Sequence, residues 1–345
     1  MSITVEDVKA ALAQVIDPNT HKDFVSSKTV KNLKVDGDDI SLDIELGYPA
    51  KSQIDLIRKS VLAALRVLPG VGNVSVGVSS KIISHTVQRG LKPMSNVKNI
   101  IAVASGKGGV GKSTTAVNLA LALAAEGATV GMLDADIYGP SQPRLMGVSD
   151  AKPTAHNKVL NPVPTPYGVP LLSMGMLVAA DQAIAWRGPM AAGALTQMMD
   201  ANWGAADTLV LDLPPGTGDV QLTMVQKYRP TGAVIVSTPQ DLALIDARRA
   251  IDLFVKAGIP IIGLIENMAG YACPSCGEIS DPFGTGGAEA AAAELGLPFL
   301  GRIPLDIRVR IASDAGTPPA AGNGPEGAAF QGVADKVAAW IATST

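Results

Sequence analysis

A glycine-rich stretch, residues 106–114, has the residue types and spacing of a loop that binds nucleotide phosphates. It follows an apolar run, 100–105, that predicts a buried strand, and it leads into a helical run, 114–125. The glycines allow consecutive backbone N–H groups to point at phosphate oxygens, and the helix N-terminus adds partial positive charge. We therefore predict an ATP site in which Lys112 meets the β and γ phosphates and Ser113 binds Mg²⁺. The predicted nucleotide-binding residues of the loop are Gly106, Lys107, Gly108, Gly109, Val110, Gly111, Lys112, Ser113 and Thr114.

The same loop also fits the dinucleotide-binding pattern G-x-G-x-x-G, through Gly106, Gly108 and Gly111. Asp134 lies about where such a fold has the acid that binds the ribose. The spacing of the glycines alone does not distinguish the ATP loop from the dinucleotide loop. Lys112 and the Ser after it favour the ATP loop, because a dinucleotide loop has no use for a lysine and a metal-binding hydroxyl there.

Three carboxylates come at the ends of predicted strands. Asp212 ends the apolar run 209–212, where it is expected to support Mg²⁺, and the glycine-rich loop 213–219 that follows could sense the γ-phosphate. Asp134 and Asp136 end a second run, and a carboxylate there is well placed to orient the attacking water. One such aspartate could be a helix cap, but three beside a phosphate loop indicate a catalytic site.

Cys273 and Cys276 are the only cysteines, and they form one C-x-x-C in a loop rich in glycine and proline. In a reducing compartment this spacing favours metal binding or redox chemistry over a structural disulfide. A [4Fe-4S] cluster takes four Cys ligands, and structural zinc usually takes four ligands, so one chain falls two short. A two-fold dimer supplies 2 + 2 thiolates at its axis, which favours a bridging cluster. Zinc on the same four thiolates is the main alternative, and a thioredoxin-like dithiol is a weaker one.

The chain has 345 residues, which favours two domains. Its 28 basic and 31 acidic residues give a net charge of −3 without basic runs, so we expect no nucleic-acid partner. The N-terminus is polar and acidic, unlike a secretory signal, and the apolar stretches are too short to span a bilayer. We therefore expect a cytoplasmic protein without a membrane partner.

We predict an α/β fold in which a small α+β domain precedes a P-loop NTPase domain with a doubly wound, mostly parallel sheet. The small domain covers residues 1–84, a polar linker covers 85–98, and the P-loop ATPase domain, which contains the two cysteines, covers 99–345. The small domain is expected to contain helices at 3–16 and 52–68 and strands at 29–35, 40–46 and 73–78. The large domain alternates apolar strands and helices and ends in an amphipathic helix, 327–345. Its predicted strands are IIAVAS, TVGMLDA, TLVLDLP, GAVIVST and IIGLIEN.

The phosphate loop, with its additional Lys107, resembles the deviant Walker A loop of the MinD/ParA/nitrogenase-iron-protein superfamily of dimeric ATPases. Further motifs resemble the Mrp/ApbC type of iron-sulfur cluster carrier, and residues 3–80 resemble the MIP18-like domain that often precedes it. Related small domains often have a cysteine in the loop after the second strand, but residues 47–51 contain none. The carrier-like motifs are Asp134-Ala-Asp-Ile-Tyr-Gly-Pro-Ser141, Trp186-Arg-Gly-Pro-Met190, Asp212-Leu-Pro-Pro-Gly-Thr-Gly-Asp219, Ser237-Thr-Pro-Gln-Asp241, and Glu266-Asn-Met268 followed by Cys273-Pro-Ser-Cys276.

The resemblance implies a homodimer that hydrolyses ATP slowly and transfers a [4Fe-4S] cluster to apo iron-sulfur client proteins. It also implies that Lys107 reaches the nucleotide of the neighbouring subunit, that Asp136 positions the water, and that Asn267 reads the adenine edge. Lys107, Asp136 and Lys112 are thus the expected catalytic residues. A zinc-stapled dimeric scaffold is the second interpretation. A ParA-like DNA-partitioning or MinD-like positioning ATPase is the third. These would need, respectively, a basic DNA-facing surface or a basic C-terminal amphipathic helix, and the sequence indicates neither.

Overall fold

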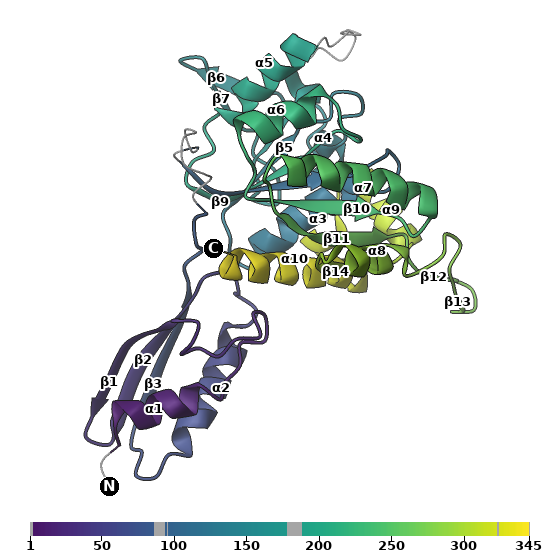
Figure 1. Cartoon of the computed structure of the whole chain (residues 1–345). Coiled ribbons are helices and arrows are strands. Elements are labelled where there is room, and N and C mark those ends of the chain that lie inside the picture. The colour runs from purple at the N-terminus through teal and green to yellow at the C-terminus, as the bar shows by residue number, and fades with distance from the viewer. Residues whose placement is uncertain (1–2, 86–93, 95, 178–187, 323, 345) are drawn as a thin grey trace. The chain divides into compact units, whose positions relative to one another are not determined.

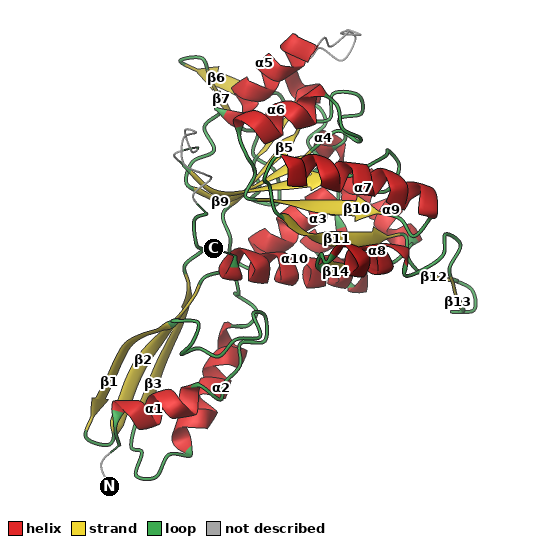
Figure 2. Ribbon diagram, viewed as in Figure 1, coloured by secondary structure: helices red, strands yellow, loops and turns green. Residues whose placement is uncertain are grey.

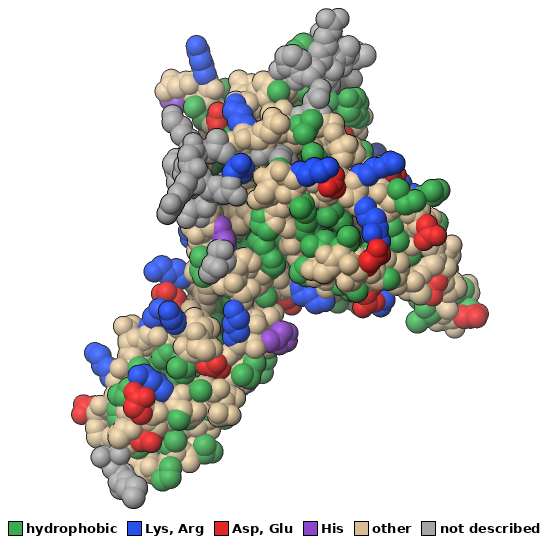
Figure 3. Space-filling model, viewed as in Figure 1, with side chains coloured by type: hydrophobic (Ala, Val, Ile, Leu, Met, Phe, Trp, Pro, Cys, Tyr) green, Lys and Arg blue, Asp and Glu red, His purple; other side chains and the backbone are tan. Residues whose placement is uncertain are grey.

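The computed structural model describes residues 3–85, 94, 96–177, 188–322 and 324–344. Most of the predicted linker, 85–98, and Trp186 and Arg187 of the carrier-like motifs lie outside the described residues. The chain divides into two compact units, one formed by residues 1–83 with 335–345 and the other by 84–334. On the face shown in Figure 3, basic and acidic side chains are interspersed among hydrophobic and other ones.

The N-terminal unit is the α+β arrangement that the sequence predicts. Its three-stranded sheet has the order β1-β2-β3, with β1 and β2 antiparallel and β2 and β3 parallel. Alternate residues of β2 are buried, as expected for a sheet covered on one face, and the buried faces of α1 and α2 complete the core (Figure 1). The elements are α1 (Val5–Leu12), β1 (Val30–Asp36), β2 (Asp39–Leu46), α2 (Ile54–Arg66) and β3 (Val74–Ser80).

The first helix is shorter than the predicted 3–16. It begins after Thr4, whose hydroxyl accepts a hydrogen bond from the Asp7 N–H in a capping box, and it ends at Leu12. Ile16 instead forms an isolated β-bridge with Asp23. The prediction overran because apolar spacing continues to Ile16, whereas the Asp-Pro pair that follows disfavours helical backbone.

The larger unit contains a seven-stranded, all-parallel sheet with the order β14-β11-β10-β4-β9-β5-β8 (Figure 2). The five predicted strands are all present, and two short edge strands, β8 and β14, were not predicted. The bounds are β4 (Val97–Ala104), β5 (Val130–Asp134), β8 (Leu171–Ser173), β9 (Ala206–Asp212), β10 (Gly232–Ser237), β11 (Ile261–Asn267) and β14 (Phe299–Ile303).

The strand order makes the sheet doubly wound. The connection from β4 to β5 runs toward the β8 edge, whereas those from β9 to β10 to β11 to β14 run toward the other edge. Because parallel crossovers are right-handed, α3 covers one face, and α6, α7 and α8 cover the opposite face. The direction reverses beside β4, and ligands of such folds bind outside the carboxyl ends of the strands at this point. The helices are α3 (Lys112–Ala125), α4 (Gln142–Leu145), α5 (Gly188–Met199), α6 (Asp219–Lys227), α7 (Asp241–Lys256), α8 (Gly287–Leu295), α9 (Ile307–Asp314) and α10 (Pro325–Thr343).

The remaining elements are short. Two small antiparallel hairpins, β6-β7 and β12-β13, pair outside the main sheet. The predicted closing helix is α10, in which the apolar face is buried, and no helix among the described residues is long and apolar enough to cross a membrane. The short elements are β6 (Thr154–His156), β7 (Val159–Asn161), β12 (Tyr271–Ala272), β13 (Ile279–Ser280) and the 3₁₀ turns η1 (Met174–Leu177) and η2 (Pro319–Ala321).

Candidate nucleotide site and cysteine hairpin

The glycine-rich loop connects the end of β4 to the start of α3. Gly109 and Gly111 both have φ of 81°, a left-handed conformation that strains other residues, and Gly111 is the N-cap of α3. The loop lines a cleft of about 270 Å³, together with Asp136 and Pro215 from two other loops. The predicted phosphate loop is therefore an open cradle at the carboxyl end of the central strand.

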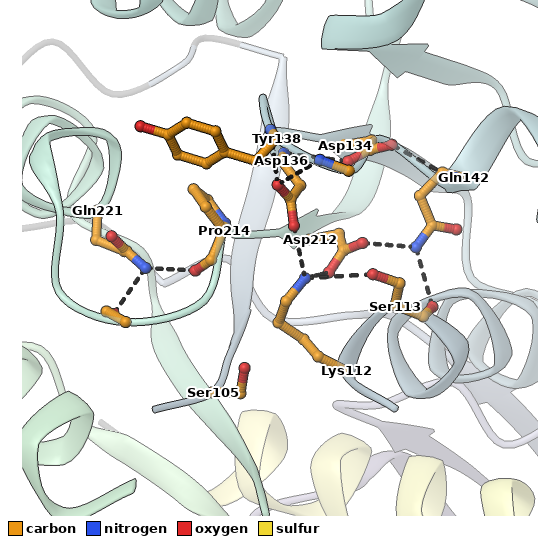
Figure 4. A network of polar contacts seen from close by, with 12 residues as sticks. Ser105, Lys112, Ser113, Asp134, Asp136, Tyr138, Gln142, Asp212, Pro214 and Gln221 are labelled. Atoms are coloured by element: carbon orange, nitrogen blue, oxygen red, sulfur yellow. Dashed lines mark hydrogen bonds and ion pairs between the residues drawn. The ribbon is translucent and has the colours of Figure 1, made fainter. Parts of the chain in front are cut away.

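Lys112 lies at the centre of the polar network below this cleft. Its ammonium group forms an ion pair with the fully buried Asp212 and lies 3.9 Å from Asp136 Oδ2 and 3.3 Å from Ser113 Oγ (Figure 4). Asp212 ends β9, and Asp136 lies two residues after the end of the neighbouring parallel strand, β5. Four residues that the sequence analysis selected from three separate motifs thus lie within one site.

Asp136 is oriented by the loop that follows it. Its Oδ1 accepts hydrogen bonds from the backbone N–H groups of Tyr138 (3.1 Å) and Gly139 (3.2 Å). The other oxygen, Oδ2, faces Lys112. This carboxylate therefore presents one oxygen to the cleft in a defined orientation.

Gln142 joins the network, and the sequence analysis did not select it. Its side-chain N–H₂ donates to Ser113 O (2.9 Å) and to Asp212 Oδ2 (2.8 Å), and its backbone N–H donates to Asp134 Oδ2 (3.1 Å). The side chain is fully buried at the start of α4. In the sequence, Gln142 is only a polar residue directly after the 134–141 motif. Its place in the site becomes evident only from its burial in the structure.

The surroundings of Asp134 raise the pKa of its carboxyl group. Complete burial, followed by the charge of Asp212, raises its pKa from 3.8 to about 7, against the opposing effect of N–H groups from Gln142 and Asp136 and the hydroxyl of Ser173. Ser173 Oγ donates to Asp134 Oδ2 at 3.0 Å. The folded chain therefore holds a proton at this site more tightly than the unfolded chain does.

This shift predicts a pH dependence of stability. A raised pKa in the folded state contributes stability that is complete below about pH 4 and is lost as the pH rises toward about 7. We expect the free energy of unfolding of wild type, relative to that of Asp134→Asn, to fall across this interval. Denaturant titrations of both proteins without nucleotide or Mg²⁺, at steps from pH 4.5 to 7.5, measure the difference. Parallel curves would contradict the assignment.

Asn267, at the end of β11, contacts the phosphate loop directly. Its side-chain Nδ2 donates to Val110 O at 2.8 Å, and only 8% of the residue is exposed. A Cβ at Gly111 would lie 2.0 Å from that nitrogen, so this position needs glycine for space as well as for its backbone conformation. An amide has a further N–H and a carbonyl oxygen, which are the groups that an adenine edge would require.

The cysteines lie on the β12–β13 hairpin. The Cys273 N–H donates to Glu278 O (2.9 Å), and the Gly277 N–H donates to Cys273 O (2.8 Å), which closes a tight turn around both thiols. The backbone N–H of Cys276, then that of Ser275, and then the Cys276 side chain hold the pKa of Cys273 below its usual value. The turn therefore favours a thiolate, the form that binds metals.

Both cysteines are free thiols. Cys276 is exposed and Cys273 is partly exposed, and neither forms a disulfide. Among the described residues, no three His, Cys, Asp or Glu side chains gather where they could hold a metal ion. Within the described residues, the hairpin therefore holds two thiols without a third metal-binding side chain beside them.

The parallel sheet, the glycine-rich loop after its central strand, and Lys112 and Ser113 at the start of α3 define a P-loop NTPase. The chain belongs to the NUBPL iron-transfer P-loop NTPase family, whose sequence model matches residues 96–338. A second family model, described as iron-sulfur cluster assembly protein, matches residues 5–76. The predicted resemblances of both parts are thereby confirmed.

Similar proteins agree with this assignment. An iron-sulfur cluster carrier protein of Deinococcus radiodurans is 45% identical over 313 residues, which cover 89% of this chain and 87% of that protein. A nucleotide-binding protein from Archaeoglobus fulgidus, solved with ADP, has a TM-score of 0.60 at 38% identity, covering 68% of this chain and 93% of that one. The septum site-determining protein MinD of Pyrococcus horikoshii, solved with Mg-ADP, has a TM-score of 0.50 at 26% identity, covering 68% and 94%.

Proposed function

We propose that the chain is an ATP-dependent carrier of a [4Fe-4S] cluster, which a homodimer binds between its subunits and transfers to apo iron-sulfur client proteins in the cytoplasm. The observation that carries the proposal is the cysteine hairpin, which holds two accessible thiols in a turn that favours the thiolate. A cluster needs four thiolates, and a two-fold dimer places the same hairpin twice at its axis. The name of the Deinococcus relative supports the same cargo.

The residues of the phosphate loop fit Mg²⁺-ATP. Lys112 and the N-terminus of α3 supply positive charge for the phosphates, and Ser113 and Asp212 supply oxygen atoms suited to Mg²⁺. A bound Mg²⁺ would neutralise charge on the phosphate oxygens. Asp136, with one oxygen held by backbone N–H groups, orients the attacking water, and Asn267 binds the adenine edge.

Exposed apolar residues beside the phosphate loop support a second copy of the chain as the partner. Leu242 and Ile245 on α7 are 73% and 50% exposed, and Tyr138, after Asp136, is 83% exposed. The α7 backbone adjoins the loop so closely that a Cβ at Gly106 would lie 2.0 Å from Asp246 C. A dimer interface that buries these side chains would bring a second subunit close to the nucleotide. Lys107 of each subunit could then reach the nucleotide of the other.

The proposal is tested by anaerobic reconstitution with iron and sulfide. We expect a brown protein with about four irons per dimer, and we expect Cys273→Ala to lose both colour and iron, because it leaves only two of the four thiolates. The reconstituted wild type is then mixed with an apo-enzyme that requires a [4Fe-4S] cluster, and recovery of that enzyme's activity measures transfer. A brown dimer that restores no apo-enzyme would contradict the carrier function.

Zinc is the second candidate, since the same turn of backbone N–H groups around two thiols also suits a zinc site. A zinc-stapled dimer would stay colourless after reconstitution and hold about one zinc per dimer. Asp136→Ala would also leave the metal content and the dimer of such a scaffold unchanged, because nucleotide would then have only a structural role. Metal analysis of the reconstituted dimer therefore separates the two candidates.

A further inference from the structure

The loop that carries the cysteines is anchored at both ends by one buried carboxylate. It leaves the sheet after β11, whose last two residues are Glu266 and Asn267, and it returns at the start of α8. Glu266 is fully buried, and its two oxygens accept hydrogen bonds from the N–H groups of Gly286 (2.9 Å) and Ala288 (2.7 Å). The point of departure and the point of return are thus joined through a single side chain.

Arg302, on β14, completes the surroundings of Glu266. Its Nε donates to Glu266 Oε1 at 3.1 Å, and its Nη2 forms an ion pair with the half-exposed Glu289 on α8. A buried carboxyl group needs such hydrogen-bonding partners, so these contacts fix the position of the Glu266 side chain. A displacement of the end of β11 therefore displaces the start of α8 and the return of the cysteine loop.

The neighbouring residue, Asn267, connects the same strand end to the nucleotide site. It donates to Val110 O in the phosphate loop and lies against Gly111. The backbone then turns sharply, with Met268 at φ 59° and Gly270 at φ 80°. Hydrogen bonds from the Ala269 N–H to Ile303 O (3.1 Å) and from the Leu305 N–H to Gly270 O (2.9 Å) fix this turn to the edge of the sheet. Cys273 is three residues after Gly270. The path from the phosphate loop to this thiol is therefore short, and hydrogen bonds fix it as far as Gly270.

We infer that Glu266 and Asn267 are positioning residues that transmit nucleotide binding at the phosphate loop to the two cysteines. The inference rests on the proposed function, because it assigns the route by which ATP changes the hold on the cluster. Asn267 senses the loop through Val110, and Glu266 passes the movement to both ends of the cysteine loop. Neither residue touches the cluster or the phosphates in this role.

The test uses the full-length, reduced protein without iron, so its outcome is independent of whether a cluster can be reconstituted. Alkylation of Cys273 and Cys276 by iodoacetamide is followed by mass spectrometry, with and without saturating Mg-ADP or a non-hydrolysable ATP analogue. In wild type we expect nucleotide to change the alkylation rate about fivefold or more, the range of ordinary coupling between sites. An unchanged rate would overturn the inference.

Two variants and a matched control locate the route. Glu266→Gln and Asn267→Ala are expected to bind saturating nucleotide but to lose most of its effect on alkylation. Glu289→Gln removes the other carboxylate that pairs with Arg302, at the surface, and is expected to respond as wild type does. A full nucleotide effect in Glu266→Gln would overturn the inference.

Fluorescence titration of nucleotide on every variant shows whether the fold survives the change. If Glu266→Gln no longer binds nucleotide, Arg302→Met provides the second measurement, because it weakens the same anchor from a half-exposed side chain. A reduced nucleotide effect in Arg302→Met supports the route. If Arg302→Met instead shows the wild-type effect of nucleotide on alkylation, while Glu266→Gln cannot bind nucleotide, Glu266 has only a structural role. That outcome would overturn its assignment as a positioning residue.

Discussion

Lys112→Ala is expected to abolish nucleotide binding and also to destabilise the chain in the absence of nucleotide. The substitution leaves the fully buried Asp212 without its cation, beside Asp136 and Asp134. Removing one partner of a buried ion pair costs about 3–5 kcal/mol, because the other charge stays buried and unpaired. Denaturant titration of the apo-protein measures the loss, and a fluorescent ADP analogue measures binding.

Two comparisons test the reason for this loss. Adding Asp212→Asn to Lys112→Ala removes the unpaired charge, so the double variant is expected to regain stability without regaining nucleotide affinity. Lys98→Ala breaks a more exposed pair with Asp207, and a cost of only about 0–1 kcal/mol is expected there. A Lys112→Ala protein as stable as Lys98→Ala would contradict the buried-charge argument.

Gly111→Ala is expected to be far more damaging than Gly109→Ala, although both glycines have the same φ of 81°. At Gly109 an added Cβ meets nothing within 4 Å, so the cost is the backbone strain alone, about 1–3 kcal/mol. At Gly111 the Cβ would lie 2.0 Å from Asn267 Nδ2, so the amide must also leave Val110. Apo-protein stability and ADP affinity, measured side by side, test the difference.

A double variant separates space from strain at this position. Asn267→Gly empties the volume that the new methyl group needs, so Gly111→Ala combined with Asn267→Gly is expected to lose less stability than the sum of the two single changes. If the two losses add, strain alone explains Gly111→Ala, and contact with Asn267 has no part in it. Equal losses for Gly109→Ala and Gly111→Ala would lead to the same conclusion.

The central strands of the sheet could be predicted from sequence, whereas its edges could not. Buried parallel strands such as β9 and β10 contain consecutive apolar residues, 209–211 in β9 and 233–236 in β10, which stand out along the chain. The edge strand β8 is three residues long, and β14 contains Gly301 and Arg302. Such short or interrupted segments become strands because a neighbour pairs with them, and that neighbour is not visible locally.

Some residues of the nucleotide site could likewise be predicted from sequence, and others could not. Lys112, Asp136 and Asp212 could be selected because each ends or begins an element whose type the sequence predicts. Gln142 was not selected at all, and Glu266 was named within a motif but without a role, because the importance of both comes from burial beside residues far along the chain. A polar side chain in a sequence is usually solvated, and only tertiary packing makes these two exceptions.

The β12–β13 hairpin has a further consequence for the kinetics of cargo release. It consists of one pair of two-residue strands, joined through two residue pairs, and it has no ladder with the seven-stranded sheet. Elements with so few backbone pairs open with a small free energy, far below that of global unfolding. Amide hydrogen exchange is therefore expected to be fast at 271–280 while β10 and β11 stay protected. Under the proposed function, a cluster held by the two cysteines would be released by local opening of the hairpin, at a rate independent of the stability of the ATPase core.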